Sequence, residues 1–305
     1  MTGGASPAVP AQGLLDPDFV RELSLLRRRL KVDVRSGGGG EHVARRRGGS
    51  AEFQEHRPYA PGDDLRRIDW LAFARSGTPV VKTFRAEEDV VVRLLLDASA
   101  SLDFGNPRKI EVSRRIAAAL SYLALADSER VQLLVSGTPE TRGLAVVGEP
   151  RRGRGALHRV LYDLSHIEAS GRTSLPAALR AVSERALRPG LLVVISDFFD
   201  AGPVAEELSR LRAQGHALTL VQVLSRMELA PDFEGDLGLV DSETQTEVEV
   251  TMDPSAIEAY LARLAGLVEE LRATARRLGG RYVRVLTDEP LEAPVRRIVL
   301  GSRED

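Results

Sequence analysis

The chain contains no cysteine. This absence excludes disulfides, thiol catalysis and metal sites built from thiolates, and it fits a reducing compartment. No stretch approaches the roughly 18 consecutive apolar residues of a membrane-spanning helix. The first residues also lack the basic flank and apolar core of a signal peptide. The sequence therefore predicts a cytoplasmic protein with a disordered tail over residues 1–13.

An excess of one charge is also absent. The 42 Lys and Arg residues nearly balance the 44 Asp and Glu residues, for a net charge of -2. This balance argues against a protein whose main task is coating nucleic acid. Three consecutive arginines, residues 45–47, lie in a glycine-rich stretch without interleaved aromatic residues. We therefore expect a solvated or intramolecular loop there, and contact with phosphate or nucleic acid is the less favoured alternative.

Two sequence motifs of enzymes are missing as well. The chain has no G-x-x-x-x-G-K-[ST] loop, so ATP hydrolysis is not expected. It also has no G-x-S-x-G elbow of the kind that carries a nucleophilic serine.

An alternation of strands and helices begins at residue 90. Apolar runs predict strands over 90–97, 130–136, 191–196, 217–223 and 281–286, with an edge strand near 143–147. Helical patterns lie between them, over 107–126, 154–165, 175–187, 203–214 and 255–278, and a hairpin is predicted over 237–252 with its turn near 242–244. This alternation predicts an α/β fold with a doubly wound, mostly parallel sheet.

The residues ahead of this pattern form a smaller lead-in. A helix is predicted over 15–30, and shorter alternating segments follow over 51–89. We therefore expect an N-terminal segment over 14–89 and a sheet domain over 90–300.

Oxygen-bearing side chains follow two of the predicted strands. Asp97 ends the first strand and is followed by Ser99 and Ser101, while Asp197 ends the strand over 191–196. Ligands of doubly wound sheets bind beyond the carboxyl ends of the strands, where the winding direction reverses. Thr173 precedes the helix that leads into the second strand. Two carboxylates and three hydroxyls suit a hard cation, Mg²⁺ or Mn²⁺.

Each of these residues also has a structural interpretation. The two serines are common turn residues. Thr173 or Ser174 is a typical helix N-cap. Asp200 competes with Asp197 for the second carboxylate position.

The same residues resemble a known site. The spacing D-x-S-x-S at 97–101, followed by Thr173 and Asp197, is similar to the metal-ion-dependent adhesion site of von Willebrand factor A-type domains. Upstream, "YAPGDDLRRIDW" (59–70) resembles the signature of a bacterial family, domain of unknown function 58, which carries a von Willebrand A-like core. The resemblance covers roughly residues 14–300.

This resemblance implies a non-catalytic protein-binding module. The domain would hold the metal, and an acidic side chain of a protein partner would fill the last coordination position. Family members are often encoded beside MoxR-type AAA+ ATPases, which implies a chaperone-like adaptor role with such an ATPase as partner.

The segment before the only tryptophan alternates in charge. Asp63, Asp64 and Asp69 interleave with arginines ahead of Trp70. We expect paired charges and a buried indole that fix the lead-in to the sheet, since networks of charges stabilise more than isolated pairs. A partner-binding surface is the alternative.

One enzyme alternative remains. A magnesium-dependent phosphohydrolase of the haloacid dehalogenase type also places an acid after a buried strand. That chemistry needs a second acid two residues later, where this chain has Ser99. The binding module is the favoured interpretation.

Overall fold

The structure is a computed structural model. It describes residues 13–36, 52–61, 63–65, 68–85, 90–137, 143–171, 173–199, 203–231, 235–240, 247–252 and 254–301. The chain divides into two compact units, one of residues 1–44 and 90–305 and one of residues 45–89. Predictions for most of the tail (1–12), the three arginines, Asp200 and the hairpin turn near 242–244 lie outside the described residues.

The larger unit is built on a six-stranded sheet. Its strands are β3 (Val91–Leu96), β4 (Arg130–Ser136), β5 (Leu144–Arg152), β6 (Leu191–Ser196), β7 (Ala217–Leu224) and β10 (Arg281–Leu286). They lie in the order β10-β7-β6-β3-β4-β5, and every neighbouring pair is parallel except β4 and β5. When the six strands are renumbered 1–6 in chain order and counted from the β5 edge, the order is 3-2-1-4-5-6, as in doubly wound folds. The predicted α/β fold is confirmed.

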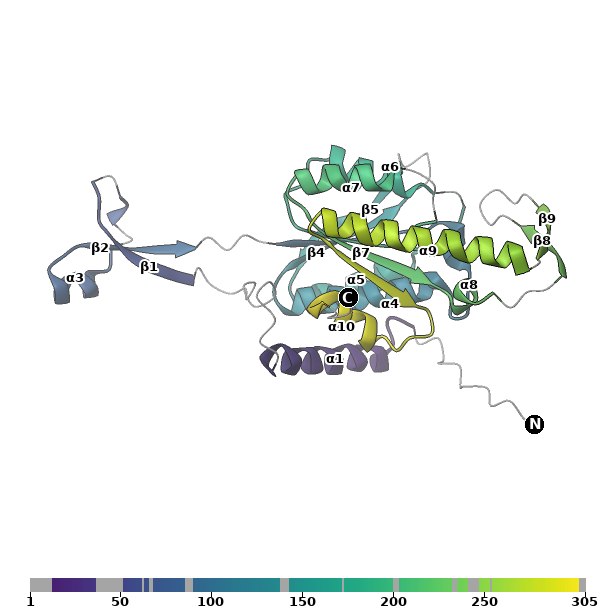
Figure 1. Cartoon of the computed structure of the whole chain (residues 1–305). Helices are drawn as coiled ribbons and strands as arrows, with labels where there is room; N and C mark the ends of the chain where they lie inside the picture. The colour runs from purple at the N-terminus through teal and green to yellow at the C-terminus, as the bar shows by residue number, and fades with distance from the viewer. Residues whose placement is uncertain are drawn as a thin grey trace. The chain divides into compact units, whose positions relative to one another are not determined.

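Helices cover both faces of this sheet (Figure 1). One face carries α1 (Pro17–Ser36), α4 (Lys109–Ala126), α5 (Leu157–Ser165) and α10 (Glu292–Leu300). The other carries α6 (Leu175–Glu184), α7 (Val204–Ala213) and α9 (Pro254–Arg277). Leu94 and Leu96 pack into the first layer and Leu95 into the second, because successive strand residues point to opposite faces. Burial on both faces explains the unbroken apolar run of β3.

Strand β5 and helix α10 depart from the sequence prediction. The edge strand β5 extends to Arg152, beyond the predicted 143–147. Helix α10 was not predicted, since it is short and Pro294 interrupts its pattern. Proline is tolerated in a first helical turn, and Val295 and Ile298 bury the helix against the first layer.

Helix α1 corrects the predicted domain boundary. Phe19 and Leu23 are fully buried, and Leu26 is nearly so. They share one hydrophobic cluster with α4 and α10. Helix α1 therefore packs with the sheet unit, whereas the sequence pattern predicts it in an N-terminal segment over 14–89.

The smaller unit is a hairpin with a short helix. Strand β1 (Glu52–Pro58) pairs antiparallel with β2 (Val80–Arg85), and α3 (Trp70–Ser76) lies between them in sequence. Asp69 caps α3, because its Oδ1 accepts hydrogen bonds from the backbone nitrogens of residues 71 and 72.

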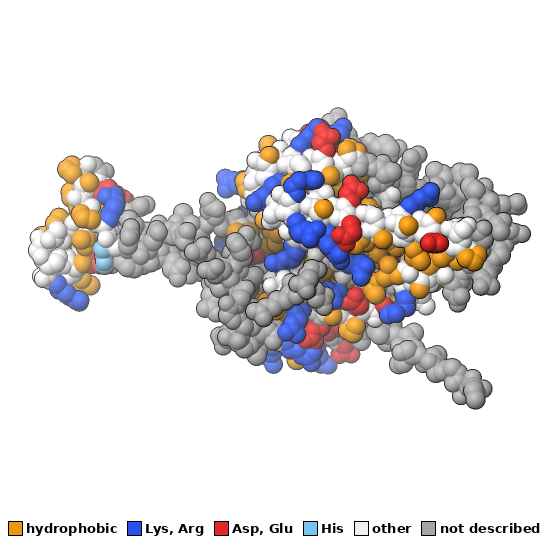
Figure 2. Space-filling view, in the orientation of Figure 1, with side chains coloured by type: hydrophobic (Ala, Val, Ile, Leu, Met, Phe, Trp, Pro, Cys, Tyr) orange, Lys and Arg blue, Asp and Glu red, His pale blue; other side chains and the backbone are white. Residues whose placement is uncertain are grey.

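The charged segment of this unit behaves differently from the prediction. Asp63 pairs with Arg57 of β1, and this hydrogen bond lowers the pKa of the Asp63 carboxyl. Trp70 is 61% exposed, so the expected buried indole is wrong. Its seven-residue helix buries none of its side chains. Hydrophobic side chains accordingly reach the surface of this unit in Figure 2.

The remaining described elements follow β7. They are α8 (Arg226–Leu229) and the antiparallel hairpin of β8 (Gly235–Val240) and β9 (Glu247–Met252). Within the described part of the chain, no helix combines the length and apolar character needed to cross a membrane.

Candidate functional site

Three polar residues meet where the central strands end. The register pairs Leu96 of β3 with residue 135 of β4 and with residue 195 of β6. Asp97 therefore lies level with Ser136 and Ser196, the last residues of the two flanking strands. This edge is where the winding of the sheet reverses, the usual ligand position in such folds.

Asp97 accepts four hydrogen bonds. Its Oδ1 accepts from the Ser99 backbone nitrogen at 3.0 Å, from Ser136 Oγ at 2.9 Å and from Thr173 Oγ1 at 3.2 Å. Its Oδ2 accepts from Ser196 Oγ at 2.6 Å. The residue is only 3% exposed. Burial raises the pKa of the Asp97 carboxyl, the charge of Asp197 adds to this effect, and the hydrogen bonds oppose it.

The two predicted serines form a hydroxyl pair. Ser99 Oγ lies 3.0 Å from Ser101 Oγ. Ser99 is buried, while Ser101, in the 3-10 turn η2 (Ala100–Asp103), is partly exposed. The site is therefore open to solvent on the side of Ser101.

The structure separates the roles of two adjacent residues before α6. Ser174 is the N-cap, since its hydroxyl accepts from the Ala177 backbone nitrogen at 3.3 Å. Thr173 is thereby free to point its hydroxyl at Asp97. The alternative of Thr173 as the helix cap is excluded.

Asp197 lies at the same edge and is 1% exposed. Its Oδ1 accepts from the Phe199 backbone nitrogen at 3.1 Å, and its Oδ2 accepts from Lys109 Nζ at 2.7 Å. The intervening Phe198 has a φ of 61°, a left-handed conformation that costs a bulky residue about 1–3 kcal/mol. The buried Phe198 ring holds this turn in place.

Sequence reasoning missed four residues of this edge: Lys109, Ser136, Ser196 and Glu228. The two serines carried a signal, because each ends an apolar strand as Asp97 does. Lys109 carried a weaker signal. A cation is disfavoured in the first turn of a helix, so a lysine at this position suggests a nearby carboxylate. Glu228 Oε1 accepts from Lys109 Nζ at 2.6 Å, across 119 residues of sequence, and no local pattern predicts this contact.

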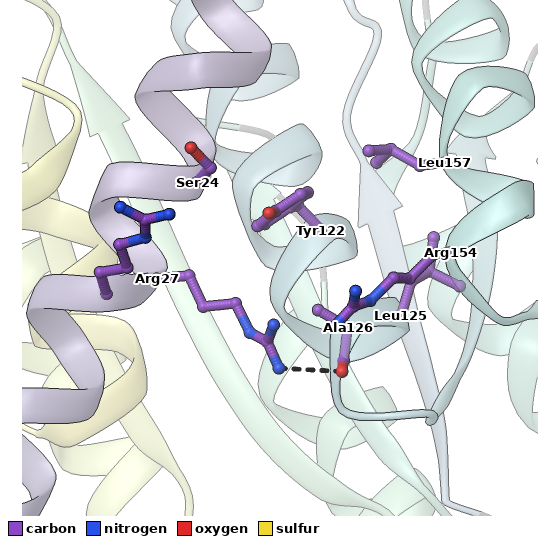
Figure 3. Close-up of a pocket in the computed structure, with 8 residues that line it drawn as sticks. Ser24, Arg27, Tyr122, Leu125, Ala126, Arg154 and Leu157 are labelled. Carbon is purple, nitrogen blue, oxygen red and sulfur yellow. Dashed lines mark hydrogen bonds between the residues drawn. The ribbon is translucent and has the colours of Figure 1, made fainter.

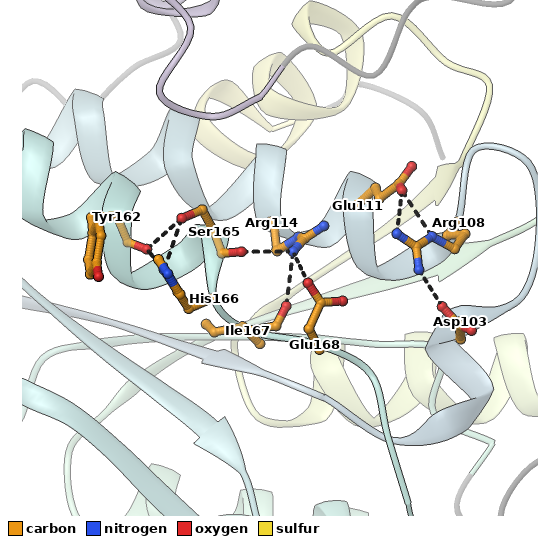
Figure 4. A network of polar contacts seen from close by, with 9 residues as sticks. All are labelled: Asp103, Arg108, Glu111, Arg114, Tyr162, Ser165, His166, Ile167 and Glu168. Atoms are coloured by element: carbon orange, nitrogen blue, oxygen red, sulfur yellow. Dashed lines mark hydrogen bonds and ion pairs between the residues drawn. The ribbon is translucent and has the colours of Figure 1, made fainter.

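Polar contacts fix the loops that carry the site (Figure 4). Arg108 donates to Asp103 at 2.8 Å and to Glu111 at 2.7 Å, which ties the turn of Ser101 to the start of α4. Arg114 donates to the backbone oxygens of residues 165 and 167. It thereby holds the segment that leads to Ser170, whose backbone nitrogen donates to Ala98.

The residues at this edge fit a hard divalent cation. Two carboxylates and three hydroxyls supply oxygen only, which is the ligand type that Mg²⁺ and Mn²⁺ prefer. Asp197 and Glu228 contact the buried Lys109 ammonium, whereas Asp97 is surrounded by hydroxyl and backbone donors. Ionised Asp97, Asp197 and Glu228 together with the lysine cation carry two net negative charges. No cluster of three or more His, Cys, Asp or Glu side chains suited to a metal occurs in the described ranges, so a nitrogen-rich site of the zinc type has no support there.

Comparison with known proteins identifies the family. Residues 55–267 match the family described as "Protein of unknown function DUF58". The chain belongs to the DUF58 family. All five predicted site residues lie inside the matched region.

Other proteins resemble this DUF58 chain over most of its length. "Uncharacterized protein Rv1480" of Mycobacterium tuberculosis is 29% identical over 293 residues, which cover 94% of this chain and 91% of that protein. The crystal structure of "conserved hypothetical protein BatB" from Bacteroides thetaiotaomicron has 14% identity, covers 69% of this chain and 97% of that chain, and has a TM-score of 0.43.

A "von Willebrand factor type A" structure from Catenulispora acidiphila also has 14% identity and a TM-score of 0.43, covering 73% of this chain and 43% of that chain. Both TM-scores are low, so the strand order carries the assignment of the fold. That order agrees with the von Willebrand A-like core expected of a DUF58 protein.

The DUF58 chain also has a hollow far from this edge (Figure 3). A pocket of about 320 Å³ lies among α1, α4 and the start of α5, lined by residues that include Ser24, Tyr122 and Arg154. Arg27 Nη2 donates to the Ala126 backbone oxygen at 2.9 Å, which caps the last turn of α4. Lys109 begins the same helix of 18 residues, which is ~27 Å long. The pocket contains none of the candidate site residues.

Proposed function

We propose that the chain is a non-catalytic protein-binding module that depends on a divalent metal ion. The observation that carries this proposal is the convergence of Asp97, Ser99, Ser101, Thr173 and Asp197 at the carboxyl edge of β3 and β6. In this proposal they hold Mg²⁺ or Mn²⁺. The bound ion would supply one coordination position for a carboxylate oxygen of a protein partner.

The surroundings of the site suit a protein partner. Phe104 is 42% exposed, Phe199 38% and Met227 44%. Phe104 and Phe199 flank the Lys109 ammonium, with ring centroids 5.8 and 5.0 Å from Nζ. Met227 precedes Glu228 on α8. Exposed aromatic and Met side chains beside a polar centre are typical of protein interfaces.

The partner that we propose is a MoxR-type AAA+ ATPase. The chain would then serve as an adaptor in chaperone-like assembly or maturation, in the cytoplasm. This step rests on the family resemblance of the sequence.

The test uses the purified full chain, a purified MoxR-type ATPase from the same organism, and metal. Isothermal titration should show Mg²⁺ or Mn²⁺ binding to the chain alone. Because the ATPase itself needs Mg²⁺, the control is Asp97→Asn in the same buffer. Complex formation that is equal for the wild type and Asp97→Asn, or unchanged by EDTA, would contradict the proposal.

The phosphohydrolase alternative has less support. Ser99 supplies no general acid. Magnesium-dependent release of phosphate from nucleoside triphosphates or phosphate esters, lost in Asp97→Asn, would revive the enzyme.

A further inference from the structure

A buried lysine contacts the candidate site from within the fold. Lys109 is 1% exposed. Its Nζ lies 2.7 Å from Asp197 Oδ2 and 2.6 Å from Glu228 Oε1. Three separate elements converge there: the first turn of α4, the turn after β6, and α8. One carboxylate of the pair belongs to the candidate metal set and the other does not.

The position of Lys109 is costly unless both carboxylates compensate for it. The first turn of a helix carries partial positive charge and disfavours a cation. An ammonium removed from water also loses its hydration. The two ion pairs and the rings of Phe104 and Phe199 offset these costs.

Glu228 is itself held for this contact. Its Oε2 accepts from the Ser225 backbone nitrogen at 2.6 Å, which closes a capping box at the start of α8. The other oxygen, Oε1, is thereby directed to Lys109. Glu228 thus offers the ammonium a second carboxylate that no metal needs.

We propose that Lys109 is a built-in cation that competes with the divalent ion for Asp197, and that Glu228 keeps the ammonium when the ion binds. Lys109 and Glu228 thereby set the metal affinity of the site. This inference rests on the proposed metal-dependent function. It also links metal binding to α8, which carries the exposed Met227.

The competition predicts effects of opposite sign. Lys109→Met removes a positive charge beside the ion and should tighten Mn²⁺ binding by about tenfold or more. Glu228→Gln still accepts the Ser225 amide hydrogen but leaves Lys109 with Asp197 alone, so Mn²⁺ binding should weaken by about tenfold. A lysine that merely positions Asp197 predicts the reverse for Lys109→Met, which is weaker binding.

The experiment measures free Mn²⁺ by electron paramagnetic resonance during titration of the full chain with MnCl₂. The matched control is Glu207→Gln, which removes another buried carboxylate, paired with Arg180 at 2.9 Å on α6 and α7. This control should leave the Mn²⁺ affinity unchanged. The double variant Lys109→Met/Glu228→Gln should bind Mn²⁺ more tightly than Glu228→Gln alone, and this comparison decides the question if Lys109→Met does not fold.

The outcomes separate the inference from the proposed function. Wild-type binding of Mn²⁺ with weaker or unchanged binding in Lys109→Met overturns the competition and leaves the metal-dependent function standing. The competition is also overturned if Glu228→Gln changes the Mn²⁺ affinity by the same factor in the wild type and in Lys109→Met. No Mn²⁺ binding by any variant overturns both. If Lys109→Met binds Mn²⁺ and the wild type does not, the competition is supported, because the lysine then keeps Asp197 from the ion in the wild type.

Discussion

Asp97 combines a structural role with a proposed metal role, and two substitutions separate them. In Asp97→Asn, the new side-chain amide would keep an oxygen for the three donors at Oδ1 and place its nitrogen toward Ser196 Oγ. This substitution should therefore change the apo unfolding free energy by less than about 1 kcal/mol. Asp97→Ala leaves buried donors unpaired and should cost about 1–3 kcal/mol. Thermal melts in EDTA measure both.

The metal contribution appears when Mg²⁺ is added to the same proteins. An ion at about 100 times its dissociation constant stabilises the native state by roughly 2.7 kcal/mol. The wild type should gain this increment, and both variants should lose it. If neither Mg²⁺ nor Mn²⁺ changes the melting temperature of the wild type, the metal hypothesis is contradicted.

His216 makes stability depend on pH. It is fully buried, and burial together with the charge of Arg93 lowers the pKa of its imidazole. Below about pH 6.5 the unfolded chain takes up a proton that the native state resists. The unfolding free energy should therefore fall by at most about 1.4 kcal/mol per pH unit from this residue, down to the native pKa.

The comparison for this prediction is His216→Leu in urea between pH 8 and pH 5. The wild type should lose stability relative to the variant only on the acid side. His158→Leu, which replaces an exposed histidine of α5, is the matched control for the substitution itself. Parallel curves for the wild type and His216→Leu would contradict the prediction.

At the N-terminus of α6, the capping hydroxyl of Ser174 lies next in sequence to the hydroxyl of Thr173, a proposed metal ligand. Ser174→Ala removes the cap and should lower the unfolding free energy by about 1 kcal/mol, equally with and without Mg²⁺. Thr173→Val keeps the side-chain shape and should diminish the Mg²⁺ increment. Differential scanning calorimetry of both variants, each in EDTA and in Mg²⁺, gives the four melting temperatures that are compared. Equal Mg²⁺ increments in the two variants would contradict the division of roles.

The strands and the site differ in how well sequence predicts them. Apolar runs such as residues 91–96 predict strands that are buried on both faces. Their alternation with helices then predicts a doubly wound, mostly parallel sheet. Asp97, Ser99 and Ser101 are neighbours in sequence, so their pattern was visible. Lys109 and Glu228 were not predicted, because their contact depends on α4 and α8 meeting across the edge of the sheet. The prediction that the Trp70 indole is buried was wrong, because the local sequence does not show which face of a seven-residue helix packs against the rest of the protein.

We expect the two units of the chain to differ in stability. The sheet unit has two extensive hydrophobic layers. In the smaller unit, Ile68 and Val81 are buried hydrophobic side chains. Units this small bury little surface and are marginally stable alone. All five candidate site residues belong to the sheet unit.

The single tryptophan makes this inequality measurable. Trp70 lies in the smaller unit, whereas most helices, and hence most far-ultraviolet ellipticity, belong to the sheet unit. In a urea titration, Trp70 fluorescence should change at a lower concentration than ellipticity does, because the smaller unit has less buried apolar surface to lose. Added Mg²⁺ should move only the ellipticity transition to higher urea. Coincident transitions that move together on adding Mg²⁺ would show instead that the two units unfold as one cooperative structure.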